Sequence, residues 1–319
     1  MKHWNSIKKG IYFGLITVFV LTSISCQKKE DRFSFVFLTD IHVQPELHAG
    51  EGFRETVQMV NELKPDFVLT GGDLVMDVLG QSFDRADRLY QMYLDISGQF
   101  EMPVYNTMGN HEIFGVNKNS GVNSSHPEFG KKMYQNRINE RYYSFDHKGW
   151  HFMLLDSVQI TSDHSYVGGV DEQQMEWIEQ DLQSVAPETP IIISTHIPLI
   201  SVYPLFSGNP VGGKLSSIVV NNGHSVLQLF KDHNLKLVLQ GHLHIVEDIL
   251  IGGIRFITAG AVSANWWEGP RDGMEEGFAL IHIKGSSVEW EYIDTQWDHT
   301  QFDREEEETH SDSNKQGGI

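Results

Sequence analysis

Residues 33–42 read FSFVFLTDIH, an apolar run that ends in a polar turn. The part from Phe33 to Thr39 predicts a buried strand, because a short continuous run of aromatic and β-branched residues is typical of a strand covered on both faces. Asp40 and His42 follow where that strand ends. On extended backbone, side chains two residues apart point to the same side. Residues 33–42 therefore predict a buried strand that is followed directly by two side chains able to bind a metal.

The same format occurs four more times along the sequence. Each time an apolar strand ends, a turn follows, and side chains that can bind a metal appear in the turn. At the carboxyl ends of strands in α/β sheets ligands converge, and glycines there allow sharp turns. One histidine in such a turn is more often a core or surface residue, but five turns together indicate one site. The four are Gly71-Gly72-Asp73, Gly109-Asn110-His111-Glu112, Ser194-Thr195-His196 and Gly241-His242-Leu243-His244.

The residue types in these turns indicate two metal ions. Imidazole and carboxylate together suit zinc, iron or manganese better than calcium, which prefers oxygen ligands. A carboxylate such as Asp73 can bridge two ions about 3.5–4 Å apart. Such a pair generates a nucleophile at neutral pH and neutralises charge on a phosphoryl group. The pattern therefore predicts hydrolysis of a phosphoester at a dinuclear centre.

The motif set D-x-H, GGD, GNHE, TH and GHLH resembles the calcineurin-like metallophosphoesterases over residues 33–293. The resemblance implies an α/β fold, a four-layer α/β/β/α sandwich of two mixed sheets flanked by helices. It also implies which side chains bind metal: Asp40, His42 and His244 on one ion, Asp73 on both, and Asn110, His196 and His242 on the other.

The resemblance assigns catalytic roles to two further residues. His111 would face the substrate, where it protonates the leaving oxygen or stabilises the phosphoryl charge. Glu112 would lie behind it and orient the ring through a hydrogen bond. Two departures separate the chain from the purple acid phosphatases: Met76 stands where they carry tyrosine, and His42 where they carry glycine. The D-x-H form is nearer the branch with bacterial cyclic-nucleotide phosphodiesterases, which also holds monoesterases.

Four side chains are candidates for substrate binding. Trp266 and Trp267 lie in a loop after the last ligand motif and could stack on a base, sugar or aromatic ester, or could pack the loop against the sheets. Arg271 could meet a phosphate oxygen or form a surface ion pair. Tyr203 follows His196 closely and could line the same pocket.

The rest of the chain predicts one domain in which helices alternate with strands before strands dominate. Residues 114–141 are expected to be an irregular insertion and 200–221 a long loop. Helices are expected at 53–63, 82–97, 172–183 and 225–231. Strands are expected at 66–70, 104–108, 142–145, 150–155, 191–194, 235–239, 246–251, 254–258, 278–283 and 288–293.

The two ends of the chain differ from this domain. Lysines followed by a fourteen-residue apolar run, Ile11–Ile24, resemble a signal peptide over residues 1–25, and the only cysteine, Cys26, stands at the lipidation position of bacterial lipoproteins. An ordinary signal peptide with an incidental cysteine is the alternative. Residues 26–32 would form a short tether. Residues 294–319 form an acidic tail expected to be disordered.

Composition narrows the functions further. The 319 residues carry a formal charge of −19, which disfavours sequence-independent nucleic-acid binding, and one cysteine excludes an intrachain disulfide. The sequence therefore predicts an exported, membrane-anchored lipoprotein of a bacterial envelope, periplasmic or at the cell surface. It would use two iron, manganese or zinc ions to hydrolyse a small-molecule phosphoester, with diesters slightly favoured over monoesters. The alternative is a cell-surface protein that binds glycan or nucleotide on the same scaffold.

Overall fold

The computed structural model describes residues 32–208, 216–298 and 300–301. The predicted signal peptide, Cys26 and most of the predicted tether and acidic tail lie outside these ranges. The described residues belong to one compact unit. Among the described residues, no helix combines the length and the apolar character needed to cross a membrane.

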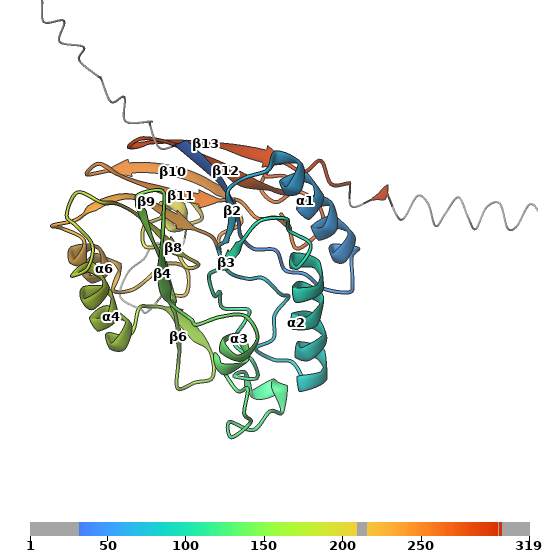
Figure 1. Cartoon of the computed structure of the whole chain (residues 1–319). Helices are drawn as coiled ribbons and strands as arrows, with labels where there is room; N and C mark the ends of the chain where they lie inside the picture. Colours follow the sequence, from blue (N-terminus) through green and yellow to red (C-terminus); the bar gives the residue numbers. More distant parts are fainter. Residues whose placement is uncertain (1–31, 209–215, 299, 302–319) are drawn as a thin grey trace, which may run out of the picture. The chain divides into compact units, whose positions relative to one another are not determined.

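Two mixed β-sheets form the centre of this unit (Figure 1). In the first sheet β1, β2 and β3 are parallel, and β12 and β13 add to the β1 edge as antiparallel strands. The first sheet has the order β13 (Ser287–Asp294), β12 (Gly277–Lys284), β1 (Arg32–Leu38), β2 (Phe67–Thr70) and β3 (Val104–Asn106).

In the second sheet β11, β9, β8 and β5 are parallel, and an antiparallel strand lies at each edge. A separate two-stranded hairpin, which the sequence analysis did not predict, joins β6 (Val158–Ile160) to β7 (Tyr166–Gly168). The second sheet has the order β10 (Val246–Ile251), β11 (Ile254–Ala259), β9 (Asn234–Gln240), β8 (Pro190–Thr195), β5 (Trp150–Leu155) and β4 (Tyr143–His147).

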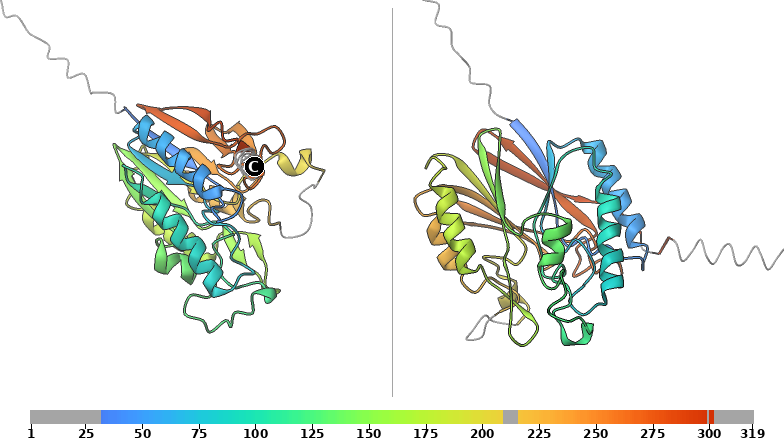
Figure 2. Two further views of the ribbon diagram at one scale, coloured as in Figure 1. Left: turned by 90° about the vertical axis from the view of Figure 1, so that its right-hand side faces the viewer. Right: turned by 60° about the horizontal axis from the view of Figure 1, so that its bottom comes forward.

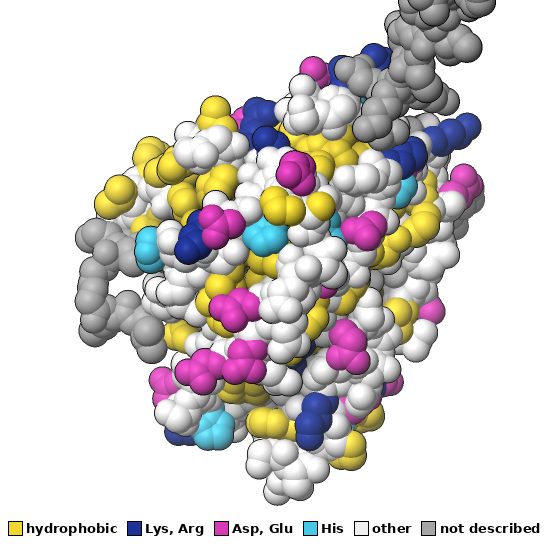
Figure 3. Space-filling view, turned by 60° about the vertical axis from the view of Figure 1, so that its left-hand side comes forward, with side chains coloured by type: hydrophobic (Ala, Val, Ile, Leu, Met, Phe, Trp, Pro, Cys, Tyr) yellow, Lys and Arg dark blue, Asp and Glu magenta, His cyan; other side chains and the backbone are white. Residues whose placement is uncertain are grey.

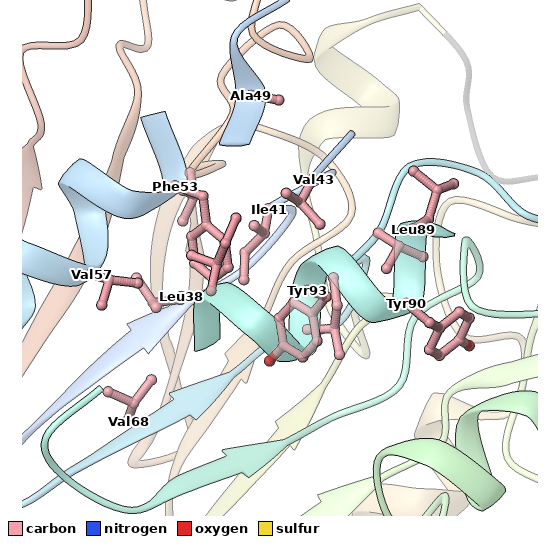
Figure 4. Close-up of a cluster of buried hydrophobic side chains, with 14 of the residues drawn as sticks. Leu38, Ile41, Val43, Ala49, Phe53, Val57, Val68, Leu89, Tyr90 and Tyr93 are labelled. Carbon is pink, nitrogen blue, oxygen red and sulfur yellow. The ribbon is translucent and has the colours of Figure 1, made fainter. Parts of the chain in front are cut away.

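Helices cover the outer face of each sheet, so the predicted α/β/β/α sandwich is confirmed (Figure 2). Helices α1 (Ala49–Leu63) and α2 (Phe83–Ser97) pack on the first sheet, and α4 (Glu172–Leu182) and α6 (Gly223–Leu229) on the second. Figure 4 shows the apolar cluster between α1, α2 and the first sheet, where Phe53 and Val57 of α1 meet Leu38 and Val68 of the sheet. These residues are buried because α1 carries apolar residues on one face.

Aromatic side chains fill the space between the two sheets, where their inner faces meet. Phe35 of β1 stacks on Phe67 of β2 at 4.9 Å between ring centroids, and both meet Phe152 of β5 edge-on. Such edge-to-face and stacked pairs add to the apolar area that each ring buries. This layer fixes one sheet against the other, and so fixes the ends of their strands, where the motif turns lie.

Two expectations about the segments between elements need correction. The insertion at 114–141 is partly regular, with a short helix α3 (Lys132–Arg137) and a 3₁₀ turn η1 (Lys118–Ser120). It is tied to the second sheet by Lys131 and Arg141, which both pair with the buried Asp156. The loop at 200–221 contains a single-turn helix, α5 (Tyr203–Phe206). These short elements depend on long-range pairing that no local pattern reveals.

The folded part extends beyond the predicted boundary at residue 293. Thr295 donates its backbone N–H to the carbonyl of Glu276, and the Trp297 ring packs edge-on against Trp267 at 5.9 Å. Trp297 is buried. The first residues of the predicted tail therefore belong to the fold, because Trp297 completes the apolar cluster beside α1.

Charged side chains are distributed over the surface without a dominant cluster on the face that Figure 3 shows. Acidic side chains are spread across this face, and Lys and Arg side chains stand between them. Among the described residues in this view, no continuous basic stripe is visible. This distribution agrees with the formal charge of −19.

His151 on β5 makes a pH-dependent contribution to stability. Its Nδ1 and Nε2 atoms lie 2.7 Å from carboxylate oxygens of Asp146 and Asp181. Burial alone would lower the His151 pKa, but these two hydrogen-bonded carboxylates outweigh burial and raise it above the usual 6.5. The folded state therefore holds the proton more tightly, and this stabilisation is full below pH 6.5 and is lost as pH rises through the raised pKa.

We expect His151→Gln to lower the free energy of unfolding by about 1–3 kcal/mol at pH 6 and by much less at pH 9. Urea unfolding of the metal-free protein at both pH values measures the difference. His282→Gln is the control, since His282 is half exposed and pairs with one carboxylate at 3.3 Å. An equal loss at both pH values would contradict the charged pairing.

Candidate metal centre

The five motif turns meet at one end of the two sheets. Three of them follow the parallel strands β1, β2 and β3, and two follow the parallel strands β8 and β9. Because all five strands end there, the seven side chains predicted as metal ligands lie close together, although they span residues 40 to 244. Most of these side chains are buried.

Asp40, His42 and His244 form the first cluster. The Nε2 atoms of His42 and His244 lie 3.0 Å apart, and His244 Nε2 lies 3.3 Å from Asp40 Oδ1. The ligand atoms of the three residues all lie within 4.8 Å of one another. Two imidazoles and a carboxylate at this spacing can hold one metal ion.

Asp73, Asn110, His196 and His242 form the second cluster. His196 Nε2 lies 3.0 Å from Asp73 Oδ2, 3.1 Å from Asn110 Oδ1 and 3.2 Å from His242 Nδ1. The carboxylate of Asp73 also faces the first cluster, with Oδ2 3.8 Å from His42 Nε2. Asp73 is thus the one carboxylate between the two clusters, the position that a bridging ligand requires.

The backbone around the clusters leaves the coordinating nitrogens free. His196 Nδ1 lies 2.8 Å from the carbonyl of Gly71, and His244 Nδ1 lies 2.6 Å from that of Ala264. A carbonyl can only accept, so each Nδ1 carries a proton, and Nε2 is the nitrogen at which a metal ion can take the place of a second proton. This arrangement fits metal ligands, and the donor set of both clusters fits an ion in each.

Backbone strain is concentrated on the same residues. Asp40, His42, Asp73, His242 and His244 have φ between 47° and 73°, a left-handed conformation that non-glycine residues rarely adopt. Hydrogen bonds hold the turns in place: Asp40 N donates to the carbonyl of Gly72, and His42 N to that of Asp73. Strain of about 1–3 kcal/mol per residue persists only where the surroundings impose it, and it clusters at functional sites.

Two glycines of the motifs are required by close packing. A Cβ at Gly109 would lie 2.2 Å from Asp73 Oδ1, and a Cβ at Gly72, whose φ is +90°, would lie 2.7 Å from His196 Nδ1. Neither position has room for a side chain. The glycines of the GGD and GNHE motifs therefore bring the ligand-bearing turns into contact.

The titratable groups of the centre have different pKa values, because burial and neighbouring charges act on each of them differently. Burial opposes ionisation of Asp73, but His111 and His196 outweigh it and hold its pKa well below the usual range. Burial, together with neighbouring positive charge, lowers the pKa of His42 to about 4 and that of His242 to about 3. Burial would lower the pKa of His196 too, but Asp73 raises it to about 9. The buried carboxylates therefore attract a cation, here a proton on His196.

His111 lies at the edge of the centre, 3.8 Å from Asp73 Oδ2 through its Nε2 atom. Its backbone N–H donates to Asp73 Oδ1 at 2.9 Å, and its ring meets His42 edge-on at 4.6 Å. The His111 side chain is 19 % exposed, whereas those of His42 and His196 are fully buried. The structure therefore places His111 on the solvent side of the clusters.

The predicted hydrogen bond between Glu112 and the His111 ring is wrong. Among the described residues, His111 Nδ1 has no hydrogen-bond partner. The Glu112 carboxylate instead accepts four backbone N–H groups, from Asp73, Leu74, Val75 and Gly109, at 2.6–3.2 Å. Glu112 thus joins the turn that carries Asp73 to the turn that carries Asn110, and it acts on the metal centre through the backbone.

We expect Glu112→Gln to lower the free energy of unfolding by about 2–4 kcal/mol, because an amide nitrogen would replace one acceptor and face two N–H donors. Urea unfolding of the metal-free protein measures this, with exposed Glu55→Gln as the control. A Glu112→Gln variant as stable as the control would contradict the structural role of the four bonds.

Three of the four candidate substrate residues separate into two groups, and the fourth, Tyr203, lies on α5. Trp267 is 1 % exposed, donates Nε1–H to the carbonyl of Ile41, and fills the space at Gly52 of α1. It packs the loop, so its assignment to substrate is corrected. Trp266 instead lies 4.9 Å from the ring of His244, and the Arg271 guanidinium lies 4.8 Å over the Trp266 ring. Trp266 and Arg271 therefore border the first cluster.

Tyr166 is a residue of the centre that sequence reasoning missed. It lies on β7, with its ring 6.3 Å from that of His242. Burial and the charges of Asp73 and Asp77 raise its pKa, so it stays a neutral hydrogen-bond donor. The only sequence signal is the alternation in the short segments of the β6–β7 hairpin, which is too brief to identify a strand.

Comparison with known proteins agrees with this geometry. The model of the calcineurin-like phosphoesterase family matches residues 33–246. A curated relative, the 3′,5′-cyclic adenosine monophosphate phosphodiesterase CpdA of Escherichia coli K12, is 23 % identical over 244 residues, which cover 72 % of this chain and 76 % of the relative.

Solved structures share the fold at low sequence identity. A dimetal phosphatase from Danio rerio superposes with a TM-score of 0.57 at 15 % identity, covering 83 % of this chain and 99 % of that one. GAP50, the anchor in the inner membrane complex of Plasmodium, gives 0.53 at 15 %, covering 84 % and 86 %. The chain belongs to the calcineurin-like phosphoesterase family. It is a metal-dependent hydrolase of phosphoester bonds.

Proposed function

We propose that this enzyme holds two metal ions and hydrolyses a phosphodiester of a small molecule. The observation that carries the proposal is the position of Asp73, whose Oδ2 atom lies 3.0 Å from His196 Nε2 in one cluster and 3.8 Å from His42 Nε2 in the other. Iron, manganese and zinc all suit the imidazole and carboxylate ligands. When bound, two such ions supply a hydroxide nucleophile and neutralise phosphoryl charge.

The side chains at the edge of the centre act on the substrate. His111, partly exposed beside Asp73, donates a proton to the leaving oxygen. Arg271, held over the Trp266 ring, offers guanidinium N–H groups to a phosphoryl oxygen. The Tyr166 hydroxyl stands on the His242 side as a neutral donor. A phosphoryl group would thus meet donors from three sides.

A diester is favoured over a monoester by two considerations. The curated relative acts on a cyclic phosphodiester, as its name says. The D-x-H motif at Asp40 and His42 points to the same branch of the family. The alternative, a glycan- or nucleotide-binding protein, rested on two adjacent tryptophans, and Trp267 is occupied in packing.

A substrate panel tests the proposed function. Metal-free protein is reconstituted separately with Mn²⁺, Zn²⁺ or Fe²⁺ and assayed on bis(4-nitrophenyl) phosphate, 4-nitrophenyl phosphate, cyclic nucleotides and glycerophosphodiesters. We expect metal-dependent cleavage with a higher kcat/KM for diesters than for monoesters. Faster cleavage of every monoester would contradict the diester preference, and binding without turnover would favour the alternative.

We also propose that the protein is exported and anchored to a membrane of the bacterial envelope through lipid on Cys26. The position of the only cysteine after the apolar run supports this. Lipidation contributes about 0.8 kcal/mol per buried CH₂, so several acyl chains anchor a protein stably. We expect Cys26→Ser to move the protein from the membrane fraction to the soluble fraction. Retention of the variant in the membrane fraction would contradict the anchor, and wild type serves as the control.

A further inference from the structure

A surface pocket is lined in part by residues that follow the last ligand motif in sequence. It is a pocket of about 270 Å³ with three walls: helix α5, the start of β10 and the loop after Arg271. Its floor starts at Ile245, which directly follows the ligand His244. It is lined by Val202, Tyr203, Phe206, Ile245, Val246, Glu247, Asp272 and Met274.

One short turn connects the pocket with the metal centre. Arg271 and Met274 exchange both backbone hydrogen bonds, at 2.9 and 2.8 Å, so residues 271–274 form a tight turn. The Arg271 guanidinium lies over the Trp266 ring, which in turn lies against His244. Asp272 and Met274 of the same turn line the pocket. The turn therefore joins the lining of the pocket to the Arg271 and Trp266 pair that borders the first cluster.

Hydrogen bonds to Glu247 hold two walls of the pocket, helix α5 and strand β10, against each other. Glu247 is buried on β10, and its Oε1 atom accepts the N–H groups of Val202 and Tyr203 at 2.9 and 3.1 Å. Its Oε2 atom accepts the hydroxyl of Thr258 at 3.1 Å. These bonds hold α5 against β10, although the side chain of Phe206 at the rim is 88 % exposed. Val202 and Leu205 beside it are also exposed, so the rim carries a group of exposed apolar side chains, and such patches mark binding sites.

The lining selects an uncharged, apolar occupant. Both Glu247 oxygens are occupied by protein donors, so that carboxylate is not free to pair with a ligand. Among the described residues, no Lys, Arg or His lines the pocket, and Asp272 would repel an anion. Tyr203, Phe206 and Met274 offer aromatic and thioether surface to a flat ring. The volume suits one ring rather than a whole substrate.

We propose that this pocket binds an apolar ring of the esterifying group while the metal centre holds the phosphoryl group. The enzyme therefore selects phosphoesters that carry an uncharged ring close to the phosphorus, and rejects those whose substituent bears a second phosphate. The inference rests on the proposed function, because it places the phosphoryl group at the two clusters. It adds a selectivity that the metal centre alone does not have.

Two non-hydrolysable analogues with the same phosphoryl group test the pocket. Benzylphosphonate and methylphosphonate are measured as competitive inhibitors of bis(4-nitrophenyl) phosphate hydrolysis by the Mn²⁺-loaded enzyme. Their binding is also measured by calorimetry. We expect benzylphosphonate to bind about tenfold more tightly, the lower end of what burial of a phenyl ring gives. The preference should fall to about twofold in two variants. Phe206→Ser removes the aromatic side chain at the rim of the pocket, and Val246→Trp fills the pocket with a larger side chain.

Leu250→Ser is the matched control. Leu250 is 72 % exposed, comparable with Phe206, and lies on β10 with Val246, but it is not part of the pocket. The control should keep the tenfold preference. Equal binding of the two phosphonates to wild type, or a preference that survives both pocket variants, would overturn the proposal. Absence of hydrolysis would instead count against the proposed function, and the calorimetric preference would still decide the pocket.

Discussion

Asp73→Asn is expected to abolish both metal occupancy and hydrolysis. The substitution keeps the shape of the side chain but removes the negative charge between the two clusters, where Oδ2 faces His196 and His42. Removing a group that only orients a ligand costs about 10- to 100-fold in metal affinity or activity. The loss of a shared ligand should exceed this for both ions. Elemental analysis of reconstituted protein and the rate on bis(4-nitrophenyl) phosphate measure the two effects.

The control for this substitution is Asp232→Asn, which removes a charge from a carboxylate that is 82 % exposed and belongs to none of the motifs. It should keep both ions and full activity. Circular dichroism establishes that the Asp73→Asn variant is folded. A folded variant that retains two ions would contradict a bridging role for Asp73.

His111→Ala is expected to keep both ions and to lose about 10²–10⁴-fold in rate on substrates with poor leaving groups. The ligand atoms of His111, His42 and Asp73 also lie within 4.8 Å of one another, but we take Asn110 as the ligand at that turn and leave the His111 side chain, 19 % exposed, for the substrate. If His111 protonates the leaving oxygen, the loss should shrink for 4-nitrophenolate, which leaves without a proton. Rates on an alkyl and a nitrophenyl diester, together with metal analysis, distinguish these effects.

His196→Ala is the comparison variant, because His196 lies within the second cluster. It should lose metal and slow both substrates alike. Equal losses on both substrates in His111→Ala with metals retained would favour electrostatic stabilisation of the phosphoryl group. Loss of metal from His111→Ala would show that His111 is a ligand.

The sequence predicts which side chains gather at this site because the signal is local. Each ligand lies in a turn directly after an apolar strand, so the strand and the ligand are read from the same few residues, as at Phe33–His42. The strands expected at 150–155, 246–251 and 288–293 agree with β5, β10 and β13 to within one residue. Parallel strands that end together then bring the turns into one place.

The surroundings of the centre depend on contacts between distant residues, which no local pattern shows. Trp267 packs against Gly52, more than 200 positions earlier, and so becomes part of the core. Glu112 looks like a partner of its neighbour His111 but binds backbone at Asp73. The pocket at α5 exists because Glu247 holds that helix in place. These features follow from tertiary packing rather than from periodicity.

Titration of the metal-free enzyme with Mn²⁺, with the rate of bis(4-nitrophenyl) phosphate hydrolysis followed at each addition, tests the central claim most directly. Two clusters that share Asp73 predict a rate that rises until about two equivalents are bound per chain and then stays constant. A rate that saturates at one equivalent, or hydrolysis that does not depend on metal, would contradict a dinuclear centre.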